Sequence, residues 1–194
     1  MVGVAILEKN KVMDWLLDLG KSFLNKEKVI LISKLLLLLP ILIILSAIIA
    51  RGYPFIGQIV QLCFDLGFAV MCLGLMVAIY KQNCKFPIIG YYVIVTFIKG
   101  VYLFFITSQP TQHGELYTLI FVLSLILHTI TGIQLLKTDF SVFGKAFLVY
   151  VGGIVLSALL NTSNHELFSA LVSTLSLMIL IYPFYKELPN YYNE

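Results

Sequence analysis

Two charged residues stand inside otherwise apolar runs of this sequence. Asp65 lies in the run 56–80, and Lys99 lies in the run 86–107. If both runs cross a bilayer as antiparallel helices, the two residues lie about 13 and 12 Å from the same membrane face, at about 1.5 Å per residue. Opposite charges at matching depth predict an ion pair. Because a charge in hydrocarbon costs roughly 2.5–3.5 kcal/mol even on insertion scales, such residues are candidates for function.

The other polar residues of the apolar runs recur on one helix face in each run. Lipid disfavours polar faces, so we expect these faces to point inward and to line a polar cavity in the outer half of the membrane. The predicted lining residues are Gln58, Gln61, Thr96, His128, Thr131, Ser157 and Ser173. The alternative is that they serve helix packing alone, since small and hydroxyl residues such as those of Gly153xxxSer157 and Ser169xxxSer173 pack membrane helices closely.

His128 has two interpretations within the run 116–136. A buried histidine is often a hydrogen-bonded core residue, whereas its titration near neutral pH also suits a ligand or a proton relay. The sequence leaves both open.

Catalytic and metal-binding motifs are scarce. The sequence contains no HExxH, CxxC, GxSxG or Walker pattern. His113, Glu115, His165 and Glu166 could meet as a metal site if two outer loops adjoin, but solvated loop residues are the simpler interpretation. We therefore expect no metal, no cofactor and no catalytic residue, and a membrane enzyme ranks third among the function classes.

The composition indicates an integral membrane protein. Hydrophobic residues make up 60% of the chain and charged residues 12%, whereas soluble domains carry about 25% charged residues. The mean hydropathy is +0.97. The net charge of +3 comes from lysines in predicted loops and gives no indication of nucleic-acid binding. Of the 13 basic residues only Arg51 is an arginine, a bias that favours an AT-rich, bacterial genome.

The predicted fold is an all-α bundle of six transmembrane helices. Each apolar run is long enough to cross about 30 Å of hydrocarbon. The predicted spans are 29–50, 56–80, 86–107, 116–136, 142–160 and 167–185, which together form one domain over 29–185 with a short tail at 186–194. Except for Lys99, every lysine then lies on the side of the N-terminus, which predicts that both termini are cytoplasmic in a multi-pass plasma-membrane protein.

Residues 1–28 are predicted to form a cytoplasmic amphipathic segment. Between residues 11 and 25 the apolar side chains share one face of a helix. The apolar positions are Val12, Met13, Trp15, Leu16, Leu17, Leu19, Phe23 and Leu24. The pattern favours a helix lying in the membrane interface. The alternative is a helix packed on cytoplasmic loops of the chain or on a partner subunit.

Two function classes fit these patterns. The first is a small-solute or ion transport component, in which Asp65, Lys99 and His128 set the charge of the cavity. The second is a noncatalytic membrane subunit, such as an assembly, regulatory or immunity protein, whose polar faces pack against a larger complex. In size and predicted topology the chain is similar to the substrate-binding membrane subunits of vitamin importers, which implies an ATP-hydrolysing partner. The lipid bilayer is the partner common to both.

Overall fold

A computed structural model of the chain describes the backbone of residues 2–49, 54–82, 87–106, 114–163 and 165–192. It describes the side chains of residues 11–38, 41, 59, 62–82, 89–102, 118–163, 165 and 168–192. These residues form helices and no strand. The helices are α1 (Val2–Phe23), α2 (Lys26–Ile49), α3 (Pro54–Lys81), α4 (Pro87–Ile106), α5 (Gly114–Leu135), α6 (Ser141–Thr162), α7 (Glu166–Lys186) and the 3-10 helix η1 (Leu188–Tyr192).

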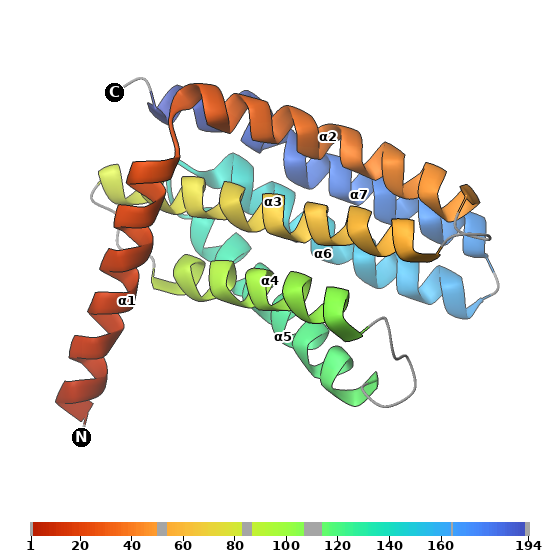
Figure 1. Cartoon of the computed structure of the whole chain (residues 1–194), viewed down its shortest axis with the longest axis horizontal. Helices are drawn as coiled ribbons and strands as arrows, with labels where there is room; N and C mark the ends of the chain where they lie inside the picture. Colours follow the sequence, from red (N-terminus) through yellow and green to blue (C-terminus); the bar gives the residue numbers. More distant parts are fainter. Residues whose placement is uncertain (1, 50–53, 83–86, 107–113, 164, 193–194) are drawn as a thin grey trace.

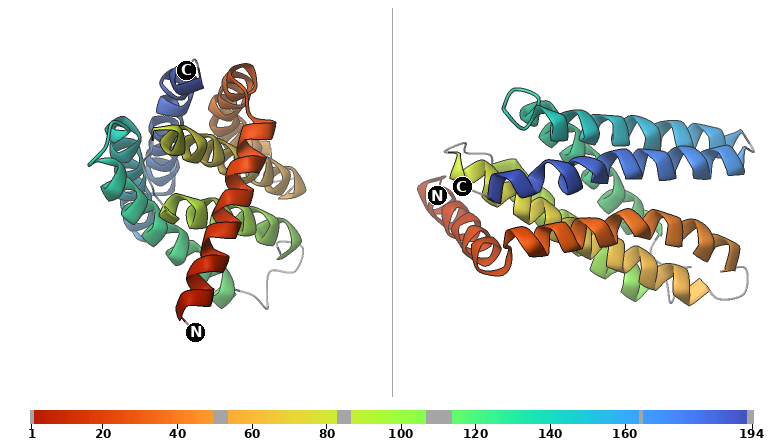
Figure 2. Two further views of the ribbon diagram at one scale, coloured as in Figure 1. Left: turned by 90° about the vertical axis from the view of Figure 1, so that its left-hand side faces the viewer. Right: turned by 90° about the horizontal axis from the view of Figure 1, so that it is seen from above.

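Helices α2 to α7 lie side by side as an antiparallel bundle, with α1 crossing one end of it (Figure 1). Each of these six helices contacts the next one along the chain, and α7 returns to contact α2. Figure 2 shows the same ring from the end and from above. The predicted helices therefore exist, and the largest shift among the six predicted spans is at α2, which begins at Lys26 instead of Val29.

Four stretches of the described residues are long and apolar enough to cross a membrane. They are Leu62–Lys81, Thr118–Leu135, Ser141–Thr162 and Phe168–Tyr192, and a shorter apolar stretch covers Ile89–Tyr102. Half of the side chains of the predicted span 29–50 lie outside the described part of the chain. The chain is thus an all-helical protein with several helices that fit a membrane.

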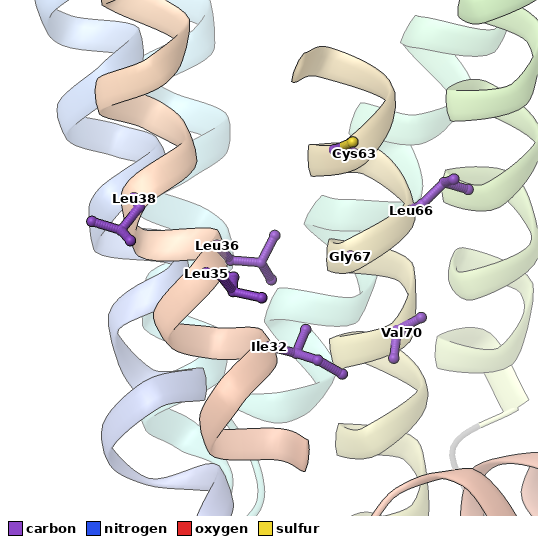
Figure 3. A pocket seen from close by; sticks show the side chains of 8 residues that line it. All are labelled: Ile32, Leu35, Leu36, Leu38, Cys63, Leu66, Gly67 and Val70. Carbon is purple, nitrogen blue, oxygen red and sulfur yellow. The ribbon is translucent and has the colours of Figure 1, made fainter. Parts of the chain in front are cut away.

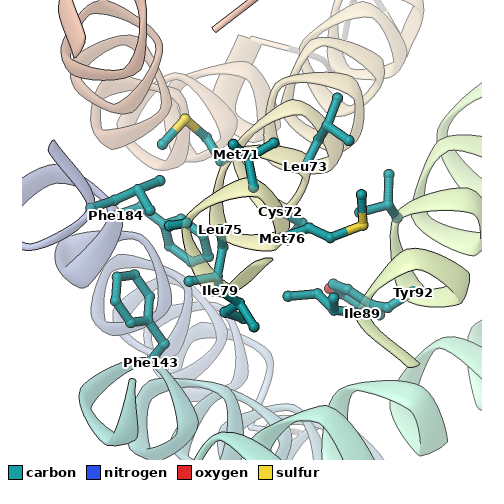
Figure 4. Close-up of a cluster of buried hydrophobic side chains, with 14 of the residues drawn as sticks. Met71, Cys72, Leu73, Leu75, Met76, Ile79, Ile89, Tyr92, Phe143 and Phe184 are labelled. Atoms are coloured by element: carbon teal, nitrogen blue, oxygen red, sulfur yellow. The ribbon is translucent and has the colours of Figure 1, made fainter. Parts of the chain in front are cut away.

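Helix α3 forms the centre of the core. Its side chains Met71, Leu75 and Ile79 are completely buried. Phe143 of α6 and Phe184 of α7 reach toward them from the opposite wall of the bundle (Figure 4). Between Phe64 and Ile79 most side chains of α3 are buried, because the helix contacts α1, α2, α4 and η1.

Helix α1 packs on the bundle through one sector of its surface. Met13, Leu16, Leu17 and Leu24 are buried there, and α1 contacts α3 and α4. Gly20 permits the close approach, since a Cβ atom there would lie 2.6 Å from Cγ2 of Val77. The helix begins at Val2, well before the predicted periodic segment, and ends just before Asn25.

Asn25 separates α1 from α2. Its Oδ1 accepts a hydrogen bond of 2.9 Å from the backbone N–H of Lys28. This is the N-cap interaction that satisfies a free donor at the start of a helix. The sharp turn places α1 across the ends of the other helices (Figure 1).

The chain after α7 packs under the same end of the bundle as α1. Leu188 is completely buried, and Tyr192 donates a hydrogen bond of 2.9 Å to the carbonyl oxygen of Gly74 in α3. The Tyr191 ring stacks on Phe140 with their centroids 4.6 Å apart. Residues 187–192 are therefore packed against the bundle.

The antiparallel helices α5, α6 and α7 approach one another closely at glycines. A Cβ atom on Gly144 would lie 2.7 Å from the carbonyl oxygen of Gly132 and from the backbone nitrogen of Leu136. A Cβ atom on Gly153 would collide with the side chain of Ser176 in α7. A Cβ atom on Gly152, by contrast, would have no neighbouring atom within 4 Å.

This contrast predicts different effects of one added methyl group at two positions of α6. We expect Gly144→Ala to destabilise the protein by about 1–3 kcal/mol, because the methyl group meets backbone that cannot rotate away. Gly152→Ala is the matched control and should be neutral or slightly stabilising, since alanine favours the helix. Thermal unfolding in detergent measures both, and equal midpoints for the two variants would contradict the packing described.

Candidate functional site

The two charges of the apolar runs meet inside the bundle. Asp65 belongs to α3 and Lys99 to α4. Lys99 Nζ lies 3.0 Å from Asp65 Oδ1, and the two side chains are 14% and 2% exposed. Their depths along the helices correspond, as the sequence predicted, because α3 and α4 run antiparallel and in contact. The ion pair is present, while its role in function stays a prediction.

Gly100 lets α3 and α4 approach each other at the ion pair. A Cβ atom on Gly100 would lie 2.8 Å from Cβ of Asp65. The residue next to Lys99 is therefore in contact with the partner helix, which leaves little freedom for the lysine to move away from Asp65. Such fixed geometry is what a buried ion pair needs to offset the loss of hydration.

A second polar pair joins α4 to α5. Tyr92 Oη lies 2.7 Å from His128 Nε2, and His128 Nδ1 lies 3.2 Å from the carbonyl oxygen of Ser124. A carbonyl only accepts, so Nδ1 carries a hydrogen, and in the neutral ring Nε2 then accepts from the tyrosine hydroxyl. Tyr92 is completely buried and His128 is 4% exposed. The predicted histidine thus has hydrogen-bond partners on both ring nitrogens.

Aromatic rings surround His128. The centroids of Tyr92, Phe147 and Tyr150 lie 4.5, 5.1 and 5.0 Å from that of the imidazole. The Phe68 ring stacks nearly parallel to the imidazole at 6.2 Å. Tyr150 comes from the middle of α6, so the rings around His128 belong to α3, α4 and α6.

One face of α4 connects the two pairs. Tyr92, Thr96 and Lys99 lie on successive turns, so the pairs are separated by about 10 Å along the helix at about 1.5 Å per residue. Thr96 lies between them, is buried, and donates a hydrogen bond of 2.8 Å to the carbonyl oxygen of Tyr92. Two further hydroxyl groups, those of Tyr102 and Thr131, are buried without a hydrogen-bond partner among the described residues.

We call the Asp65–Lys99 and Tyr92–His128 pairs the polar centre, and two predicted cavity residues, Ser157 and Ser173, have their hydrogen-bond partners elsewhere. Ser157 of α6 binds Ser169 of α7, with their hydroxyl oxygens 2.9 Å apart. Ser173 donates a hydrogen bond to the carbonyl of Ala170 in its own helix. These contacts are of the packing kind. The side chains of Gln58 and Gln61 lie outside the described residues.

The possible outer metal site also falls largely outside the described residues. His113 and the side chains of Glu115 and Glu166 are not among them. His165 is described and is exposed, with its ring near that of Phe168. Within the described side chains, no three histidine, cysteine or acidic residues gather closely enough to hold a metal ion.

Sequence reasoning did not assign Tyr92, Tyr102 or the rings around His128 to the site. Periodicity does place Tyr92 on the same polar helix face as Thr96 and Lys99, which is the signal that points to it. Phe68 and Phe147 carry no such signal, because an apolar ring in an apolar helix has the same pattern whichever neighbour it contacts.

The polar centre can exchange protons and bind charge. It combines a carboxylate, an ammonium, an imidazole and a phenol on three adjacent helices. The Tyr92 hydroxyl can both donate and accept, so it can stay bonded to His128 whether the ring is neutral or protonated. Comparisons with protein-family models, with curated proteins and with solved structures return no match for this chain. The arrangement of the polar centre therefore carries the functional argument.

Proposed function

We propose that the chain is a six-span protein of a bacterial plasma membrane that moves a small solute or ion through the polar centre. The observation that carries the proposal is the pair of buried polar contacts on one face of α4, Asp65 with Lys99 and Tyr92 with His128. Both contacts lie within helical stretches that are apolar elsewhere. Ionisable residues at such depth are costly and characteristically mark ion or proton pathways.

The composition of the centre favours a small cation or proton over a large solute. Its rings and aliphatic neighbours are closely packed, with Tyr92 and Phe147 completely buried. The groups that can change charge are few and separated by about two helical turns.

The lysine balance of the sequence supports cytoplasmic termini, and α1 and η1 lie together at that end of the bundle (Figure 1).

A proton-flux measurement tests this function. Purified protein is reconstituted into liposomes that contain the pH indicator pyranine, and a potassium diffusion potential drives protons inward. We expect acidification faster than in protein-free liposomes, and faster than in liposomes that contain His128→Phe. The fluxes of sodium and of potassium are measured in the same way. If the fluxes of all three ions equal those of protein-free liposomes, ion movement by the isolated chain is excluded.

A specific observation favours the second function, a noncatalytic membrane subunit. The small and hydroxyl residues of α6 and α7 are used in packing these two helices together, through Ser157 with Ser169 and through Gly153 with Ser176. If the polar centre serves packing in the same way, the chain has no transport role. Copurification of a larger partner, combined with no ion flux, would favour this function.

We also propose that α1 lies in the membrane interface. Its side chains fall into three sectors at about 100° per residue. One is the buried sector on α3 and α4, and a second holds charged residues such as Lys11, Asp14 and Asp18. The third holds the exposed apolar side chains Val12, Trp15, Leu19 and Phe23, with exposed fractions of 48%, 63%, 39% and 64%. A helix across the end of the bundle with one open apolar sector suits contact with lipid.

Trp15 is a built-in reporter for this contact, because it is the only tryptophan of the chain. In liposomes of lipid brominated near the headgroup we expect strong quenching of its fluorescence. The matched control is Trp15→Phe with Asp18→Trp, which moves the reporter to the charged sector and should be quenched weakly. Equally weak quenching of both proteins would mean that another protein, or water, covers the apolar sector.

A further inference from the structure

A groove between α6 and α7 opens on the surface of the bundle. It has a volume of about 400 Å³. Its floor is apolar and includes Ala146, Val149 and Ile179. Val149 and Ile179 are 47% and 46% exposed, so they meet whatever surrounds the bundle. Since both helices are long and apolar enough to cross a membrane, the groove has the surroundings and the shape that suit an acyl chain.

Positive charge borders this groove at one end. Lys145 of α6 lines the groove and is exposed. Lys186 at the end of α7 lies over the ring of Tyr182, another lining residue, with its Nζ 5.8 Å from the ring centroid. The acidic residues at this end of the bundle, Asp139 and Glu187, do not line the groove. Two ammonium groups thus border an apolar channel.

The start of α6 adds to the positive field. The helix begins at Ser141, and its N-cap residue, Phe140, makes no side-chain hydrogen bond to the free N–H groups. The N-terminus of a helix carries a partial positive charge that favours anions. Val142 and Lys145, one turn apart, both line the groove. The charged end of the groove is therefore the end where α6 starts and α7 finishes.

We propose that this groove binds an anionic phospholipid, with an acyl chain along the apolar floor and the phosphate between Lys145 and Lys186. Basic pockets between membrane helices at the cytoplasmic face recognise anionic headgroups in this way. The proposal requires that α6 and α7 lie in a membrane. It does not require ion movement through the polar centre, so either proposal can fail without the other.

A second groove provides an internal comparison. It lies between α2 and α3, and Ile32, Leu35, Cys63 and Val70 are among the residues that line it (Figure 3). Its volume is about 470 Å³, and none of its lining residues is charged. A lipid bound for its acyl chain alone would occupy both grooves without regard to headgroup. A lipid bound for its negative charge would prefer the groove between α6 and α7.

Fluorescence quenching by brominated lipid measures this preference at each groove. In a Trp15→Phe background, Tyr182→Trp places a reporter in the groove between α6 and α7 and retains a ring beneath Lys186. Leu35→Trp places one in the uncharged groove. Each protein is reconstituted in phosphatidylcholine with phosphatidylglycerol as the minor lipid. Two samples are compared, one with brominated phosphatidylglycerol and one with brominated phosphatidylcholine. Each lysine near an anionic headgroup gives about a fivefold preference, so we expect about 25-fold enrichment of phosphatidylglycerol at position 182. We expect none at position 35.

Charge-removal variants then locate the source of the preference. Lys145→Gln with Lys186→Gln should abolish the enrichment at position 182. Lys11→Gln with Lys21→Gln removes the same charge from α1 and should leave it unchanged. Three results would each overturn the proposal. The first is that brominated phosphatidylcholine quenches position 182 as its bulk fraction predicts, which means no enrichment of phosphatidylglycerol there. The others are the same enrichment at position 35 and an equal effect of the two charge-removal pairs.

Discussion

Removing either member of the buried ion pair should destabilise the protein strongly. We expect Asp65→Asn and Lys99→Met each to lower the free energy of unfolding by about 3–5 kcal/mol. Each substitution removes one member of the pair and leaves the other as an uncompensated charge in a low-dielectric interior. The side chains are 2% and 14% exposed, so water can replace little of the lost interaction. Protonation or deprotonation of the surviving group would reduce the effect.

Unfolding in detergent, followed by circular dichroism or by the fluorescence of Trp15, measures these changes. Asp18→Asn and Lys11→Met are matched controls, because both residues are exposed on α1. Surface substitutions of this kind change stability by about 0.5 kcal/mol or less. If the buried and exposed variants unfold at the same temperature, the ion pair contributes nothing to the fold.

Replacing His128 should abolish ion flux while leaving most of the fold intact. In His128→Phe the four surrounding rings can accommodate another ring, but Tyr92 loses its hydrogen-bond partner. A buried hydroxyl without a partner costs about 1–3 kcal/mol. We therefore expect a moderate loss of stability together with a proton flux reduced to that of protein-free liposomes.

Thr129→Val is the control for this loss. Thr129 is the next residue of α5 and is partly buried. Its hydroxyl donates a hydrogen bond of 2.9 Å to the carbonyl oxygen of Leu125 in the same helix. Its replacement removes a polar group without touching the contact between α4 and α5. Flux in Thr129→Val should match that of the unchanged protein. Flux in His128→Phe at the same level would remove the histidine from the proposed pathway.

The positions of the helices and the ion pair could be predicted from the sequence. Long apolar runs fix the helices, and their antiparallel order fixes the relative depth of Asp65 and Lys99. The partner of His128 could not be predicted, because periodicity gives the face on which a residue lies and not the helix that it meets. Helix α3 provides a further example, since its long apolar stretch after Asp65 gives no indication of which helices it contacts.

The polar stripes of α6 and α7 show the same limit. Ser157 and Ser173 lie on polar faces, and a face of small hydroxyl residues suits a cavity or a helix contact equally well. The structure pairs Ser157 with Ser169 and keeps Ser173 bonded within its own helix. For α1 the apolar face predicted from the sequence is divided, with Leu16 and Leu17 buried on the bundle and Trp15 exposed.

The exchange of the two charges tests most directly whether the polar centre acts in transport or only holds helices together. In the double variant Asp65→Lys with Lys99→Asp, opposite charges again face each other between α3 and α4. We expect most of the stability lost in the single variants to return, because the pairing is restored. We expect proton flux to stay at the level of protein-free liposomes, because a moving ion meets the opposite sign of charge at each position. Recovery of both stability and flux would contradict the proposal and would make the pair a purely structural contact.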